Sequence, residues 1–289
     1  MKLILSRKGF DSAAGGGPSP ILPDGRLISI PIPEPSERPG VGVPFSDIAV
    51  GHGATMADVM ADLCRRPPNW QRGAHLDPDL DGSALPRPAG WRPIFGQCAA
   101  AQAHLDNQDV GVGDVFVFFG LFRQARAAGA RLRWSPSAPR VHAAFGWLQV
   151  GEQHRNPQLD AVPWAAAHPH LRDPARPANT VYVAAPQLSF APSLPGAGLF
   201  RWSDRCLLTS HRGRTSDWRL PSCFAPRTGF RSLTYHDRGD RWRPRPDGQV
   251  DLSAVGRGQE FVTDLDDRVL HEWLLPLLSE SACSPEEAG

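Results

Sequence analysis

The residue types best suited to holding a phosphate gather in a loop near the start of the chain. Ser6, Arg7 and Lys8 follow a short apolar segment, and Gly15 and Gly16 come a few residues later. Small residues expose backbone N–H groups, and the Arg and Lys side chains add positive charge. The loop is therefore a candidate cradle for the phosphate of a substrate.

The same loop contains Asp11, a candidate acid–base residue beside Lys8. Lysine is scarce: Lys2 and Lys8 are the only two, and Arg carries nearly all of the positive charge. One interpretation is biased coding, and the other is that Lys8 is needed as an amine where a guanidinium would not serve. The loop matches neither GxxxxGK[ST] nor GxGxxG, so a surface loop without a ligand is the alternative.

A second set of candidates lies on two strongly apolar segments in the middle of the chain. Asp114 stands at the mouth of the first segment, where its carboxylate is a candidate for reading or activating a base. Phe145, Trp147 and Gln149 alternate along the second segment and so share one face of a strand. An aromatic ring beside an amide suits stacking on a nucleobase and hydrogen bonding to its edge. The alternative is an ordinary half-buried strand.

A third candidate is Glu260, which precedes an apolar run near the end of the chain. A carboxylate at the start of such a segment is a candidate general base. The alternative is a charged strand edge without a chemical role.

Two further motifs contain metal-ligand residue types, but neither has the spacing of a known site. The acidic run from His75 to Gly82 resembles a calcium loop, yet the twelfth position counted from Asp77 is Pro88 rather than Glu. His168-Pro169-His170 is too tightly spaced for a helical zinc pair, and no Cys lies near it in the sequence. We therefore favour a solvated acidic turn and assign no metal ligands, and the sequence specifies no cofactor.

The elements that must position these residues are short and separated by long loops. The chain has 289 residues, enough to bury a sizeable core, with 28 Gly and 30 Pro. Apolar and alternating segments predict strands at 2–5, 26–32, 111–120, 141–152, 180–184, 199–210, 217–220 and 256–262. Helices are predicted at 97–105, after an N-cap at Thr55, and from Asp264, where Pro276 should kink or end the helix.

Composition excludes several classes of protein. The formal net charge is +1, which argues against a global basic field for nucleic acid, although local Arg patches are compatible with it. The five cysteines are odd in number, form no CxxC motif and follow no signal peptide, as is typical of free thiols in the cytoplasm. No apolar run approaches the roughly twenty residues that span a bilayer, so a membrane partner is not expected.

The longest resemblance follows from a series of motifs in order along the chain. LSRKGFDSAAGGGPSPILPDGRLISIPIP, HLDPDL, GQCAAAQAHLDNQDVGVGDVFVFFGLFR, HAAFGWLQVGE, GLFRWSDRCLLT and GRGQEFV together resemble the nucleotide modification associated domain 3 family. This resemblance implies a role in modifying nucleotides or nucleic-acid bases, alongside other base-modifying enzymes of bacteria and phages. It assigns no reaction and no catalytic residue. Locally, GVGDVFVFFG and FGWLQVGE resemble the strand pairs of EVE and PUA-like domains, small barrels that hold modified bases.

We therefore expect an α+β fold: one strand-rich domain over 1–280, with a few short helices, a PUA-like barrel portion around 111–151 and a polar tail over 281–289. The leading hypothesis is an enzyme that acts on a nucleotide or a base in DNA or RNA. The alternative is a non-catalytic reader of modified bases, and a third class is a structural partner in a modification complex. The enzyme hypothesis requires the glycine loop and the Trp147 face to converge on one cavity.

Overall fold

The computed structural model describes residues 1–11, 15–64, 70–157, 160–211, 213–256 and 259–281. Its helices are short and few, and strands dominate, so the fold is α+β as predicted. The helices are α1 (Met56–Leu63), α2 (Ala99–Asn107), α3 (Pro169–Arg172), α4 (Asp267–Val269) and α5 (Leu275–Ser281), with a π-helical turn at Leu270–Leu274. No helix among the described residues is long and apolar enough to cross a membrane.

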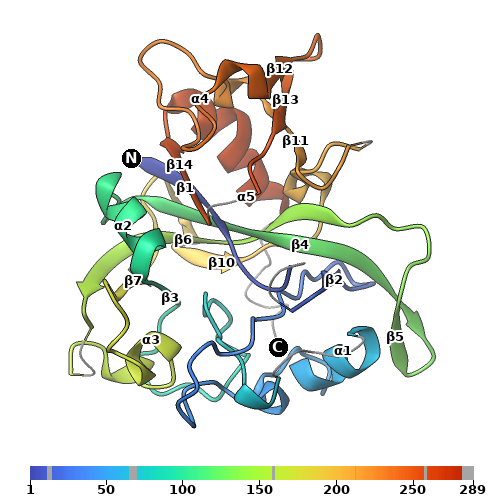
Figure 1. The fold of residues 1–289 in the computed structure, drawn as a ribbon, viewed down its shortest axis with the longest axis vertical. Helices are drawn as coiled ribbons and strands as arrows, with labels where there is room; N and C mark the ends of the chain where they lie inside the picture. The colour runs from blue at the N-terminus through green and yellow to red at the C-terminus, as the bar shows by residue number, and fades with distance from the viewer. Residues whose placement is uncertain (12–14, 65–69, 158–159, 212, 257–258, 282–289) are drawn as a thin grey trace.

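The strands form one large sheet and two small ones (Figure 1). The strands are β1 (Lys2–Arg7), β2 (Ser19–Ile21), β3 (Ile94–Gln97), β4 (Val115–Ala128), β5 (Arg131–Trp134), β6 (Val141–Arg155), β7 (Thr180–Ala184), β8 (Gln187–Leu188), β9 (Ala191–Pro195), β10 (Ala197–Leu199), β11 (Asp217–Pro221), β12 (Trp242–Pro244), β13 (Gln249–Ser253) and β14 (Glu260–Asp264).

The large sheet has the order β14-β1-β4-β6-β7-β3, with β2 and β5 paired to β4 and β10 paired to β6. β1 runs parallel to β4, and β14 pairs antiparallel with β1. The path has two separate ends, and no pairing among the described strands joins β14 to β3. The PUA-like barrel expected around 111–151 is therefore not confirmed, because β4 and β6 belong to an open sheet.

The sheet separates two layers of the molecule (Figure 1). On one side lie β11–β13 and the C-terminal helices; on the other lie α1, α3 and the loops that precede β3. Leu5, Val117 and Trp147 form one row across the strands, and Ser6 begins the next row. Side chains in one row share a face, and successive rows point to opposite faces. This alternation decides which predicted site residues can meet.

The predicted elements are largely present, with three local differences. The N-cap of α1 is confirmed: Thr55 accepts from the backbone N–H of Asp58, whose carboxylate accepts from the N–H of Thr55. The strand expected at 26–32 is wrong, because only isolated bridges occur there, and Pro31 has no N–H to donate to a ladder. The strand expected at 199–210 ends at Leu199.

The other difference concerns the last helix. It does not end at Pro276, because a π-helical turn at Leu270–Leu274 precedes α5 and the helix continues through the proline. A widened turn before a proline relieves the clash of its ring with the preceding backbone. Most of the polar tail predicted at 281–289 lies outside the described residues.

Candidate functional site

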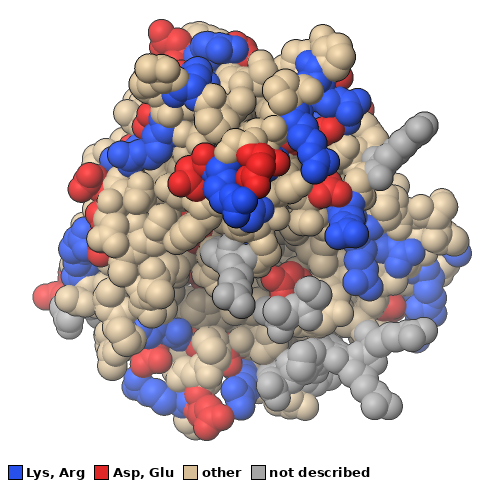
Figure 2. Space-filling view, turned by 45° about the horizontal axis from the view of Figure 1, so that its top comes forward, with Lys and Arg blue, Asp and Glu red and all other residues tan. Residues whose placement is uncertain are grey.

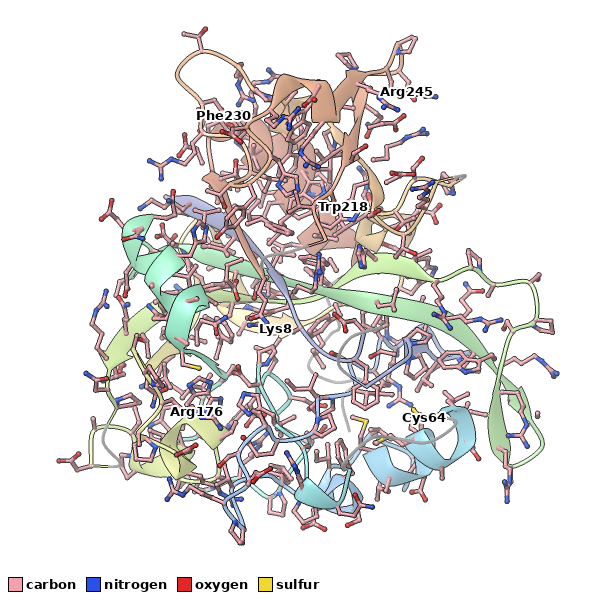
Figure 3. All side chains as sticks on the ribbon, viewed as in Figure 1. Lys8, Cys64, Arg176, Trp218, Phe230 and Arg245 are labelled. Atoms are coloured by element: carbon pink, nitrogen blue, oxygen red, sulfur yellow. The ribbon has the colours of Figure 1, made fainter. Side chains whose placement is uncertain are left out.

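A buried ion pair lies at the junction of β1 and β14, beneath the large sheet. Lys8 Nζ is 3.0 Å from Glu260 Oε1, and the two side chains are 9% and 1% exposed. Ser6 and Glu260 are directly paired across β1 and β14, which places both on the same face. Lys8 follows Ser6 by two residues and reaches that face as well. Figure 3 shows Lys8 below the long strands, whereas Trp218 lies above them.

The two oxygens of Glu260 have different environments. Oε1 accepts hydrogen bonds from Ser6 Oγ at 3.1 Å, Lys8 Nζ at 3.0 Å and Gln97 Nε2 at 2.6 Å. Oε2 is buried and has no hydrogen-bond partner among the described residues. A buried carboxylate oxygen without a partner is costly and is retained where a ligand or a reaction uses it.

β3 links this pair to the rest of the site through three successive residues. The Phe95 ring lies 4.4 Å from Lys8 Nζ, and the Gln97 amide donates to Glu260. Between them, the Gly96 N–H donates to Asp77 Oδ1 at 2.7 Å. β3 is the last strand of the sheet, so its outer edge is free to bind the loop that contains Asp77.

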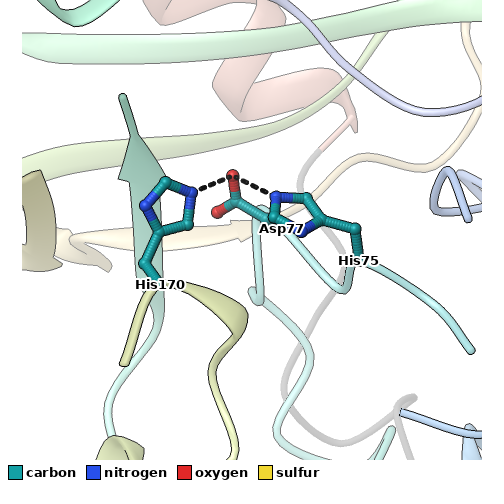
Figure 4. A group of neighbouring side chains, drawn as sticks. All are labelled: His75, Asp77 and His170. Atoms are coloured by element: carbon teal, nitrogen blue, oxygen red, sulfur yellow. Dashed lines mark ion pairs between the residues drawn. The ribbon is translucent and has the colours of Figure 1, made fainter. Parts of the chain in front are cut away.

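Asp77 is the centre of a cluster of imidazoles (Figure 4). Its carboxylate lies between two rings: Oδ2 is 3.9 Å from His75 Nε2 and 3.9 Å from His170 Nε2. His168 Nε2 is 3.3 Å from Oδ1 but is not aligned to donate to it. The Asp77 side chain is 4% exposed, although its backbone is more accessible. Two motifs separated by about ninety residues thus meet at one point.

A second shell of polar residues holds the imidazoles in place. His75 Nδ1 is 2.8 Å from Glu34 Oε2, and Arg176 Nη2 donates to the other oxygen of Glu34 at 2.6 Å. His170 Nδ1 is 2.5 Å from Asn179 Oδ1, and Asn179 Nδ2 donates to the backbone carbonyl of His170 at 2.8 Å. Partners of this kind fix the orientation of a histidine ring and the location of its proton.

The charges of the cluster favour ionised carboxylates and neutral imidazoles. Burial alone would raise the pKa of Asp77, but contact with His168 and the charges of His170 and Lys8 lower it below its usual range. Burial lowers the pKa of His170 to about 3, so this ring is neutral at neutral pH. Lys8 is therefore within electrostatic reach of both Glu260 and Asp77, which makes the two groups parts of one site.

The structure brings Ser6, Lys8 and Glu260 together, but it places Arg7 and Asp11 elsewhere. The Arg7 guanidinium lies against the rings of Phe119 and Phe261 on the opposite face and donates to backbone carbonyls near the end of β13. Burial lowers the pKa of Arg7, and the charge of Asp11 opposes this shift. Asp11 therefore lies near Arg7.

The strand-pair candidates have structural partners. Asp114 accepts from the backbone N–H groups of Lys2 and Gly111, which joins the start of β1 to the loop before β4. The Gln149 amide donates to Gly113 O and Ser189 Oγ and accepts from Ser189 N. Both side chains hold loops in place.

The aromatic candidates are buried on different faces. Trp147 is 1% exposed, packs on Phe200 and donates to Pro195 O, on the face opposite Lys8. Phe145 is 3% exposed and packs on Phe118 and Phe122. The expected convergence of the glycine loop and the Trp147 face is thus not observed.

The glycine loop is described only at its two ends. Gly15 has a φ of +92°, and a Cβ there would lie 2.3 Å from the Phe10 ring, so a side chain would disrupt this packing. Gly16 has a φ of +76° and open space around it. The part of the loop over 12–14 lies outside the described residues.

The outer surface shows no single basic field. Lys and Arg alternate with Asp and Glu over the face in Figure 2. A hollow of about 500 Å³ contains Arg219, Arg243 and Arg245, but Asp251 lies within ion-pair distance of the first and the last of these. This hollow lies on the β11–β13 sheet, on the far side of the large sheet from Lys8 (Figure 1).

Sequence reasoning missed most of the residues around Lys8. Phe95 and Gln97 lie in a segment that was expected to begin a helix. His75, Asp77, His168 and His170 were noticed as motifs, but each motif was compared separately with a known spacing. Two histidine-bearing motifs, each insufficient alone, were the available signal.

Comparison with curated proteins and with solved structures yields no match. A family model described as nucleotide modification associated domain 3 matches residues 2–264. This span contains every residue of the Lys8–Glu260 pair and of the Asp77 cluster. The chain therefore belongs to the nucleotide modification associated domain 3 family.

Proposed function

We propose that this chain is an enzyme that modifies a nucleotide or a base in a nucleic acid, and that Lys8 and Glu260 are its reacting pair. The family's name associates it with nucleotide modification. The observation that carries the proposal is the buried Glu260 Oε2, which has no hydrogen-bond partner among the described residues although Oε1 has three donors.

The three donors to Oε1 fix the carboxylate and leave Oε2 as the atom that meets the substrate. From this position Oε2 can accept a hydrogen bond, or a proton, from an N–H or O–H group of a nucleobase or sugar. The Lys8 ammonium is held beside it by Glu260 and by the Phe95 ring. A fixed positive charge in a site of low water content stabilises negative charge that develops on the substrate.

The alternative of a non-catalytic reader has less support. A reader of modified bases needs an open aromatic face on which the base can stack. Phe145 and Trp147 are 3% and 1% exposed and pack against internal partners. A buried acid beside a buried cation is the arrangement that catalysis requires and stacking does not.

The test is mass spectrometry of nucleosides from cells that carry the chain, lack it, or carry a variant. We expect a modified nucleoside to disappear on deletion and in Lys8→Met and Glu260→Gln. Lys2→Met is the matched control, because Lys2 is the only other lysine and its side chain donates to Asp109 O at the surface. This control should retain the modification.

Loss of either partner leaves a buried charge unpaired, which costs roughly 3–5 kcal/mol of stability. The double variant Lys8→Met/Glu260→Gln removes both charges and should regain stability without regaining activity. Circular dichroism and urea unfolding would establish that it is folded. An unchanged nucleoside inventory on deletion, or modification by the folded double variant, would contradict the proposal.

A further inference from the structure

The protons of the imidazoles around Asp77 can be assigned from their partners. Glu34 is a carboxylate and only accepts, so His75 Nδ1 carries the proton of their 2.8 Å contact. Asn179 Nδ2 donates to a backbone carbonyl, so its Oδ1 faces His170 Nδ1, which must also be protonated. The Nε2 atoms of both neutral rings therefore carry lone pairs.

These two lone pairs belong to atoms that surround a carboxylate oxygen. Each Nε2 is 3.9 Å from Asp77 Oδ2, and the three atoms lie within 4.8 Å of one another. A separation of 3.9 Å is too long for a hydrogen bond. Three electron-pair donors thus surround one point with no proton between them, which is unfavourable unless a cation lies there.

The balance of charge leads to the same conclusion. The neighbouring buried carboxylates each have a cationic partner: Glu34 has Arg176, Glu260 has Lys8, and Asp79 has Arg87. Within the described part of the chain, no Lys or Arg lies within ion-pair distance of Asp77, whose contacts are with histidines and the Gly96 N–H. Buried carboxylates are usually paired with a cation or coordinate a metal.

We propose that His75 Nε2, Asp77 Oδ2 and His170 Nε2 bind one divalent transition-metal ion. Two imidazoles and one carboxylate suit Fe²⁺, Mn²⁺, Co²⁺ or Zn²⁺ better than Ca²⁺ or Mg²⁺, which prefer oxygen ligands. Bonds of roughly 2.0–2.2 Å place ligand atoms about 3.4 Å apart. The side chains therefore move inward by about half an ångström when the ion binds.

Three protein ligands leave coordination positions open for water or for an oxygen of a ligand. The second shell is complete, with Glu34 behind His75 and Asn179 behind His170, as metal-binding histidines require. Binding of the ion is independent of the reaction proposed for Lys8 and Glu260, and its readout below is binding rather than activity.

The experiment uses the full chain, stripped with a chelator and titrated with Co²⁺, whose visible absorption reports its ligands. We expect one Co²⁺ per chain and a rise in the melting temperature, because an ion that binds the folded state stabilises it. Asp77→Asn and His170→Gln should each weaken binding by more than about 100-fold, beyond the roughly 10–100-fold expected for the second-shell variant Asn179→Ala.

His52→Gln is the matched control, because the His52 side chain is 77% exposed and lies outside the cluster; it should bind Co²⁺ like the parent chain. Circular dichroism would establish that each variant is folded. The proposal is overturned if the parent chain shows no saturable binding. It is also overturned if Asp77→Asn and His170→Gln bind as tightly as the parent, which would mean adventitious surface binding. A metal-binding chain with an unchanged nucleoside inventory would refute the proposed function alone.

Discussion

Arg7 and Lys8 are adjacent in the sequence, but their side chains lie on opposite faces of the large sheet. Arg7 packs on Phe119 and Phe261, whereas Lys8 meets Glu260 and the Phe95 ring. The two cations therefore cannot hold one phosphate together. At the scale of single residues, the parity of a strand position decides whether a charge supports the fold or belongs to the site.

Gly96 provides a test at this scale. A Cβ on Gly96 would lie 2.3 Å from His170 Cδ2, so Gly96→Ala must displace the ring. Overpacking of this kind costs roughly 1–3 kcal/mol. We expect lower stability in urea unfolding and weaker Co²⁺ binding. Gly239→Ala is the control, because nothing lies within 4 Å of its added Cβ. Co²⁺ affinity unchanged in Gly96→Ala would argue against His170 as a ligand.

At the scale of elements, β3 and its edge organise the site. Four residues, Ile94–Gln97, contact Lys8, Asp77 and Glu260 from one short strand. β14 delivers Glu260 by pairing with β1, and α3 begins at Pro169, next to His168 and His170. None of these elements carries the chemistry alone.

His142, on β6, makes stability depend on pH. Burial and the charge of Arg7 lower its pKa to about 4, against an opposing effect of Asp11, and Trp218 Nε1 donates to its Nδ1. The unfolded value is about 6.5, so the unfolded chain binds more protons between these limits. The contribution is present above about pH 6.5 and is lost as the pH falls toward 4, a change on the order of 3 kcal/mol.

His142→Gln should therefore reduce the pH dependence of the free energy of unfolding between pH 6.5 and 4.5. Urea unfolding at a series of pH values measures this directly. Burial also lowers the pKa of His236 to about 4, so part of the dependence will persist. His52→Gln, at a surface position, should leave the curve unchanged. An equal slope in His142→Gln and the parent would contradict the assigned shift.

At the scale of the whole molecule, charge is balanced and interspersed. The formal net charge is +1, and Figure 2 shows both signs across one face. Such a surface neutralises few phosphates at once. We expect non-specific binding to duplex DNA to be weak, with a salt dependence that corresponds to no more than about two phosphates. Fluorescence anisotropy at several salt concentrations measures this, and a slope for roughly six phosphates or more would reveal an extended basic surface.

Local patterns were sufficient for the elements that local physics controls. The apolar segments of β4, β6 and β7, the capping box of α1 and the α+β class were predicted, because periodicity and capping are properties of neighbouring residues. The strand expected at 26–32 failed because alternation alone does not provide a partner. The PUA-like barrel was not confirmed because sheet closure depends on pairing between distant strands.

The amino-acid sequence by itself determined which segments are strands, which family the chain belongs to, and that Lys8 and Glu260 were residues to examine. Only the tertiary structure decided that they meet, that Arg7 and Trp147 point away from them, and that His75, Asp77 and His170 surround one point. The physical reason is that alternation along a strand is encoded locally. The identity of the partner across a sheet is set by register between segments that lie up to about 250 residues apart.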